Sequence, residues 1–182
     1  MTRSTHALRT MFYVTSILAL AASAAYARPK HKGDPIPEAV AVPEGHKLKS
    51  SLVGSGIQRY ECAAVNGSYA WKFIAPDAQL FDRRDRPAGH HGAGPFWEAL
   101  DGSQVTAAKS AEASVSEDSI PWLLLEATGH TGSGVFADIT YIQRLETEGG
   151  LAPAAVCSEA NSGTLVDVPY RALYKFFKAS PC

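Results

Sequence analysis

The chain has 182 residues, of which 46% are hydrophobic and 19% are charged. Its 17 basic and 18 acidic residues give a formal net charge of −1 at neutral pH. This composition excludes wholesale disorder, and the charge argues against nucleic acid or an anionic membrane as the main partner.

The first 27 residues predict a secretory signal peptide. A basic leader with Arg3 and Arg9 precedes an apolar run over 11–22, and Ala25 and Ala27 form a small-residue cleavage pattern. The run is shorter than the roughly 20 apolar residues that span a bilayer, so we expect no retained membrane anchor. Cleavage after Ala27 would remove two basic residues and no acidic one, leaving 155 residues with a net charge of −3 in a secreted or periplasmic protein.

Residues 28–45 hold four prolines and predict an extended, poorly packed lead-in, and residues 46–179 predict one β domain. The first strand places Tyr60 and Cys62 on one face. Asn66-Gly67 then predicts a type I′ hairpin turn, because both residues tolerate positive φ, and 69–75 form the return strand. Pro76-Asp77 is expected to end it.

Further strands are predicted over five segments, and the glycine-rich stretches 89–102 and 129–134 predict loops. The segments are 78–81, 104–108, 120–127, 137–145 and 166–176. Residues 120–127 form a continuous apolar run, as in a strand covered on both faces, and 107–118 would tolerate a helix. We therefore expect an all-β, single-domain antiparallel β-sandwich or barrel of seven or eight short strands with little helix.

Three cysteines lie in the part expected to be exported: Cys62, Cys157 and Cys182. An oxidising compartment favours one disulfide and one remaining thiol, and three pairings are open. We favour Cys62–Cys157, because each lies beside a predicted structured segment whereas Cys182 is the last residue. Cys182 would then be a free thiol or would link two chains into a dimer.

The candidate binding residues are chemically versatile side chains in or beside the glycine-rich stretches. On a strand the adjacent His90 and His91 would point to opposite faces, so they could not easily share a metal ion. The aromatic residues near prolines would suit the mouth of a barrel that binds a small ligand. The candidates are His91, Trp97, Asp101, Trp122 and His130.

Two catalytic patterns are absent or incomplete. No G-x-S-x-G nucleophile elbow occurs, and Gly132-Ser-Gly-Val-Phe-Ala137 fits a dinucleotide fingerprint but is followed by strand-like alternation rather than a helix. We therefore assign no catalytic residue and expect no cofactor. His91 and His130 stay open as metal ligands, since imidazoles and carboxylates bind Zn and Cu, although no tight ligand spacing marks such a site.

The order of several motifs is specific: Val42-Pro-Glu-Gly45, Gly56-Ile-Gln-Arg-Tyr-Glu-Cys62, Gly89-His-His-Gly-Ala-Gly-Pro-Phe-Trp97, Ile120-Pro-Trp-Leu-Leu-Leu125 and Tyr141-Ile-Gln-Arg144. With these motifs the chain resembles the DUF3455 family of exported bacterial and fungal proteins. The resemblance implies that the single family histidine corresponds to His91 and that the two family cysteines correspond to Cys62 and Cys157. It implies no reaction, substrate or cofactor.

Three functional hypotheses follow. The first is a non-enzymatic protein that binds a small ligand or an envelope partner through the region of His91, Trp97 and Asp101. The second is a metal-dependent enzyme that uses His91 and His130. The third is a purely structural domain, in which His91 bonds a backbone carbonyl, Trp97 plugs the barrel and Asp101-Gly102 makes a turn.

Overall fold

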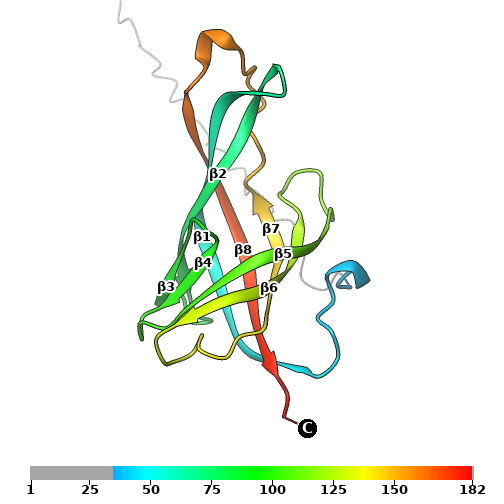
Figure 1. Ribbon diagram of the computed structural model, residues 1–182, viewed down its shortest axis with the longest axis vertical. Coiled ribbons are helices and arrows are strands. Elements are labelled where there is room, and N and C mark those ends of the chain that lie inside the picture. Colours follow the sequence, from blue (N-terminus) through cyan, green and yellow to red (C-terminus); the bar gives the residue numbers. More distant parts are fainter. Residues whose placement is uncertain (1–34, 182) are drawn as a thin grey trace, which may run out of the picture. The chain divides into compact units, whose positions relative to one another are not determined.

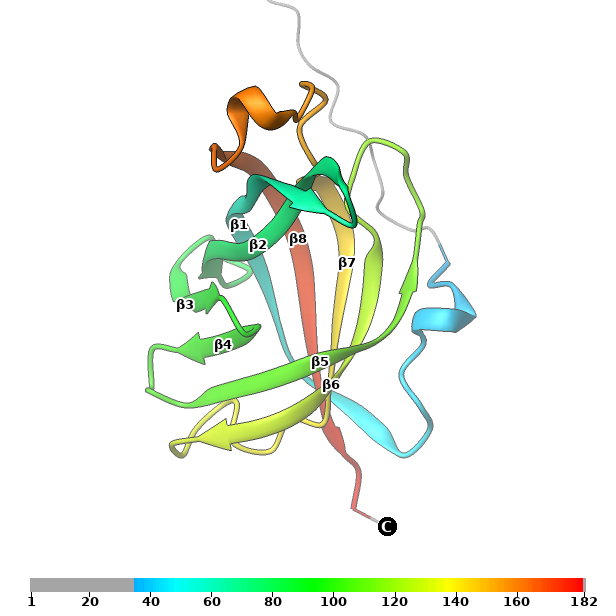
Figure 2. The same cartoon turned by 45° about the horizontal axis from the view of Figure 1, so that its top comes forward.

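Residues 35–181 of the computed structural model form one eight-stranded antiparallel barrel (Figure 1 and Figure 2). Each strand pairs with the next, and β8 pairs with β1, so the sheet has no free edge. This confirms the all-β antiparallel expectation and selects the barrel. The elements are η1 (Glu38–Val40), β1 (His46–Val65), β2 (Ser68–Phe81), β3 (Pro87–Gly92), β4 (Phe96–Ala99), β5 (Gln104–Ala113), β6 (Trp122–Thr131), β7 (Tyr141–Gly149), η2 (Glu159–Asn161) and β8 (Leu165–Ala179).

Some sequence predictions fall outside this range. The signal peptide over 1–27, the first part of the lead-in and Cys182 are not among the described residues. Within residues 35–181, no helix is long and apolar enough to cross a lipid bilayer.

The β1–β2 hairpin has the predicted turn. Asn66 and Gly67 adopt φ angles of 50° and 82°, and Val65 pairs with Ser68 on either side of them. The predicted break at Pro76-Asp77 is wrong, because β2 continues to Phe81. Pro76 pairs with Gln58 of β1, whereas pairing with β3 begins only at Ala78, so the missing N–H of the proline interrupts no ladder on that side.

The glycine–histidine stretch is a hairpin of β3 and β4 rather than a loop. Gly89 serves close backbone packing rather than a loop, because a Cβ there would clash with the carbonyl oxygen of Glu98 on β4. His90 and His91 therefore point to opposite faces. The His90 side chain is 46% exposed and lies 2.9 Å from Asp77, whereas His91 is 3% exposed.

Strand pairing overrides local propensity in the middle of the chain. The segment that would tolerate a helix lies in β5 up to Ala113, where it pairs with β6 and includes two register shifts. The predicted loop 129–134 belongs to β6 as far as Thr131, and β7 begins only at Tyr141. The period-two prediction for β8 is confirmed, since Tyr170, Ala172, Tyr174 and Phe176 are all buried.

The connections alternate between the two ends of the barrel. We call the end with the β1–β2, β3–β4, β5–β6 and β7–β8 connections the open end, and the other the closed end; in Figure 1 the β1–β2 turn lies at the top and the C-terminus at the bottom. The β6–β7 loop contributes Phe136 and Ile139, both with 0% exposure, to the core cluster that also contains Trp97, Tyr174 and Phe176. Large apolar side chains therefore fill the closed end.

A second apolar cluster lies on the outside of the barrel. Trp122 and Leu124 of β6 pack there with Val40 of η1, while Leu123 and Leu125 belong to the interior cluster. Gln143 donates a hydrogen bond of 2.6 Å to the carbonyl of Val40. Strand β6 is thus covered on both faces, as predicted, and the described part of the lead-in is less extended and better packed than the sequence indicated.

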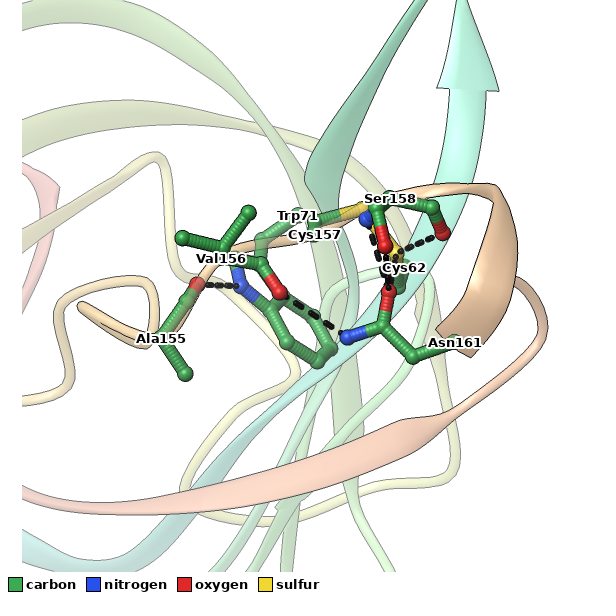
Figure 3. The surroundings of a disulfide bond; sticks show 7 residues. All are labelled: Cys62, Trp71, Ala155, Val156, Cys157, Ser158 and Asn161. Atoms are coloured by element: carbon green, nitrogen blue, oxygen red, sulfur yellow. Dashed lines mark hydrogen bonds between the residues drawn. A yellow bond between two sulfur atoms is a disulfide. The ribbon is translucent and has the colours of Figure 1, made fainter.

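The disulfide joins Cys62 and Cys157, as predicted, and ties β1 to the β7–β8 connection (Figure 3). The two Cα atoms lie 5.5 Å apart across a sequence separation of 95 residues. The same connection accepts a hydrogen bond of 2.7 Å from the indole of Trp71 to the carbonyl of Ala155. Asn161 donates to the carbonyl of Val156 at 2.9 Å, which folds η2 back beside the bridge.

The double substitution Cys62→Ser with Cys157→Ser should lower the free energy of unfolding by about 2–5 kcal/mol, because the bridge restricts the unfolded chain over a long loop. Urea unfolding followed by far-UV circular dichroism measures this difference. A reductant should destabilise the wild type and leave the double variant unchanged. Equal stability of the two oxidised proteins would contradict the prediction.

Candidate functional site

A cavity of about 550 Å³ occupies the barrel at its open end. The β3–β4 turn contributes Gly94 and Pro95 to its lining, and the β5–β6 connection contributes Pro121. Its wall is largely apolar, with Leu123 and Leu125 of β6 among the lining residues. The volume falls within the range of about 300–1,000 Å³ that is typical of small-molecule sites.

Arg144 of β7 brings a positive charge to this cavity. Its Nε and Nη2 atoms donate to the carbonyl of Pro121 at 3.2 and 2.9 Å. Among residues 35–181, no carboxylate oxygen lies within 4.0 Å of the guanidinium. Burial lowers the pKa of Arg144 from its ordinary value, but an arginine side chain stays protonated in proteins, so the cation persists.

The tyrosines around Arg144 do not neutralise it. Burial raises the pKa of Tyr60, Tyr170 and Tyr174 above 10, so their phenols stay protonated at neutral pH. Tyr60 donates to the carbonyl of Gly150 at 2.7 Å, and the hydroxyls of Tyr170 and Tyr174 lie 3.1 Å apart. Lys109 and Glu112 also line the cavity and pair with each other at 2.6 Å, so among the described residues Arg144 leaves a net positive charge at the cavity wall.

Two more buried hydrogen-bond donors at the cavity are incompletely satisfied. The Nε2 atom of Gln58 has no well-aligned acceptor among the described residues, although the Tyr170 hydroxyl lies near it, and the Nε1 atom of Trp97 has no partner there. The two side chains belong to residues that are 2% and 1% exposed, and both line the cavity. A buried donor without an acceptor costs about 1–3 kcal/mol, so these groups indicate a site built for a ligand or solvent acceptor.

His91 and Trp97 form a stacked pair at the cavity, with ring centroids 4.3 Å apart and an interplanar angle of 9°. His91 Nδ1 lies 2.7 Å from the carbonyl of Phe96, which can only accept, so Nδ1 carries the proton. Burial lowers the pKa of His91 to about 3, and the imidazole is neutral at physiological pH. Its Nε2 atom is then a hydrogen-bond acceptor.

Asp101 and His130 lie at the closed end, where they hold the β6–β7 loop. Asp101 accepts hydrogen bonds from the Ser103 backbone and hydroxyl and from the Val135 N–H, at 2.6–2.9 Å. These bonds lower the pKa of the Asp101 carboxyl. His130 Nε2 donates to the carbonyl of Ile139 at 2.7 Å. Both side chains therefore stabilise the loop that carries Phe136 into the core.

The sequence candidates thus occupy three places rather than one. His91 and Trp97 share the cavity, Asp101 and His130 share the closed end, and Trp122 lies in the outer cluster. His91 and His130 are three strands apart, about 14 Å along the sheet. In the part of the chain that the structure describes, no group of three or more His, Cys, Asp or Glu side chains could hold a metal ion.

Arg144 and Gln58 were not among the residues predicted from the sequence, although the pattern around each contains a signal. At period two, Arg144 shares a face with Ile142, which is 0% exposed. Gln58 likewise shares a face with Tyr60 and Cys62, both buried. A polar residue on the buried face of a strand needs a partner inside the barrel, and that requirement was the available signal.

The fold and the family agree. Residues 43–178 match the family described as a protein of unknown function, DUF3455. The chain belongs to the DUF3455 family. No curated protein and no solved structure matches it. The family therefore accounts for the motif order of this DUF3455 barrel and gives no activity.

The neutral state of His91 predicts a pH dependence of stability. Its pKa is about 3 in the folded protein, against an ordinary value of 6.5, so below pH 6.5 the unfolded chain binds a proton that the folded chain excludes. Stability should fall by up to about 1.4 kcal/mol for each pH unit between 6.5 and 3 from this group alone. Urea unfolding of the wild type and His91→Gln from pH 7 to pH 4 isolates this contribution.

The glutamine amide in His91→Gln still donates to the Phe96 carbonyl but does not titrate. The variant should therefore show a shallower loss of stability with falling pH than the wild type. His90→Gln is the matched control on the outer face of the same strand, and it should keep the steep wild-type dependence. Parallel pH curves for the wild type and His91→Gln would refute the assignment.

Proposed function

We propose that this protein is an exported, non-enzymatic binding protein that holds a small ligand inside its barrel. The observation that carries the proposal is the cavity of about 550 Å³ at the open end, with an apolar wall and a few buried polar groups. An eight-stranded barrel is just wide enough inside to be filled by side chains or to hold one small ligand. In this barrel, side chains fill the closed end, and the open end has room for one small ligand.

The rigidity of the surrounding structure supports a binding role. The polar groups at the cavity stand on strands: Gln58 on β1, His91 on β3, Trp97 on β4 and Arg144 on β7. Side chains on strands are held more accurately than side chains on loops, which reduces the ordering that a ligand must impose.

The structural alternative explains part of this arrangement but not all of it. It requires His91 to bond a backbone carbonyl, and the Phe96 carbonyl meets that requirement. It does not require a cavity beside Trp97, nor a guanidinium that no carboxylate within residues 35–181 pairs with. The metal-dependent alternative gains no support from the separate positions of His91 and His130.

Filling the cavity should abolish binding without unfolding the protein. Leu123→Trp adds volume to a residue of the cavity wall, so a ligand that raises the melting temperature of the wild type should have no effect on this variant. A thermal-shift screen of lipids, sugars and peptides supplies the ligand, and calorimetry measures its Kd with both proteins.

Leu100→Trp is the matched control, because Leu100 is 74% exposed in the β4–β5 connection at the closed end. It should bind as the wild type does. Binding that survives Leu123→Trp would place the ligand elsewhere, and a screen without any thermal shift would count against a small-ligand function.

Export is part of the proposal and has its own test. It is supported by the basic and apolar leader and is compatible with the disulfide, since such bonds persist in oxidising compartments. Expression of the full chain in a bacterium should yield a periplasmic or secreted product whose first residue is Arg28, which N-terminal sequencing determines. An uncleaved chain in the cytoplasm would contradict export.

A further inference from the structure

We infer that the ligand of the barrel carries a carboxylate group, which Arg144 binds, together with an apolar body that fills the rest of the cavity. This inference rests on the proposed function and specifies the chemical class of the ligand. It follows from three properties of the site: its charge, its hydrogen-bond donors and its walls.

The positive charge of Arg144 favours an anionic partner from outside the described residues. Arg144 has no carboxylate partner within residues 35–181, and the nearby tyrosines stay neutral. Glu112 also lines the cavity and its charge acts on Arg144 from beyond 4.0 Å, but its carboxylate is bound by Lys109 at 2.6 Å. A buried charge without a counter-ion is costly, whereas a ligand carboxylate would form a charge-assisted hydrogen bond with it.

The hydrogen-bond donors favour the same group. Pro121 accepts from two of the five N–H bonds of the Arg144 guanidinium, and the Tyr174 hydroxyl lies beside it. Among the described residues, Trp97 Nε1 has no acceptor and Gln58 Nε2 has only the nearby Tyr170 hydroxyl. A carboxylate has about four lone-pair positions and no donor, so it matches a site composed mainly of donors. An ammonium group would instead meet the like charge of Arg144 in the same cavity.

The apolar wall of the cavity favours an apolar body for the part of the ligand beyond its carboxylate. Leu123 and Leu125 provide apolar surface inside the cavity, while Phe73 and Ile74 line it and remain 47% and 42% exposed. An apolar body would bury these side chains on binding, which adds to affinity in proportion to the area removed from water. The combination describes an organic acid with an aliphatic or aromatic body.

The test compares matched ligands that differ only in their polar group. Alkyl, cyclohexylalkyl and phenylalkyl chains of four to ten carbons are each prepared as the carboxylic acid, primary alcohol, amine and phosphate monoester. Calorimetry at pH 7 measures their Kd with the full mature protein. We expect the acid to bind roughly tenfold to a hundredfold more tightly than the alcohol of the same body, as a charge-assisted hydrogen bond implies.

Substitutions then assign the preference to Arg144. Arg144→Met should remove the preference for the acid and keep binding of the alcohol, and Arg144→Lys should restore part of it. Arg84→Met is the matched control, since Arg84 is exposed in the β2–β3 turn at the closed end, and it should behave as the wild type. Near-UV circular dichroism verifies that each variant keeps its packed core.

The outcomes separate this inference from the proposed function. Equal binding of acid and alcohol, or tighter binding of the amine or phosphate ester, overturns the carboxylate assignment and leaves a ligand-binding barrel. Absence of binding by every compound overturns both. A preference for the acid in the wild type that persists in a folded Arg144→Met variant overturns the role of Arg144.

Discussion

The pairing of β8 with β1 is the constraint on which the rest of the structure depends. It runs from His46 and Ala179 to Glu61 and Leu165, and it converts a meander of eight strands into a closed barrel. Closure requires strand β1 to pass close to its neighbours. A Cβ at Gly54 would lie 2.6 Å from the ring of Tyr174, so a larger residue there would displace the ring that forms part of the cavity wall.

A closed barrel has a fixed interior that side chains, solvent or a ligand must fill. The cavity at the open end communicates with solvent, so water or a ligand can occupy it, whereas the same volume enclosed in an apolar core would be strongly destabilising. The polar groups at the open end favour such occupation, because they can hydrogen-bond to water or to a ligand. At the closed end, the side chains of Phe136 and Ile139 fill the interior instead.

The sequence predicted those features that depend on local pattern. Asn66-Gly67 identified the first hairpin, period two identified β8, and the position of Cys62 and Cys157 beside predicted segments identified the disulfide. It failed where a neighbouring strand decides the outcome: Gly89 looked like a loop residue but serves close contact with β4. It also missed Arg144, because a single sequence shows which residues face inward but not where the interior stays unfilled.

The cavity and the disulfide are linked by their position at the open end. The interior of the open end is less completely packed than that of the closed end, and within residues 35–181 no carboxylate pairs with Arg144. Both features lower the stability of the open end relative to the closed end. The bridge from Cys62 to Cys157 crosses the same end and offsets that loss without filling the cavity. A ligand that pairs with Arg144 would add stability in proportion to the logarithm of its concentration over its Kd. The disulfide therefore stabilises the end of the barrel where the interior packing leaves a cavity, and it does so whether or not a ligand is bound.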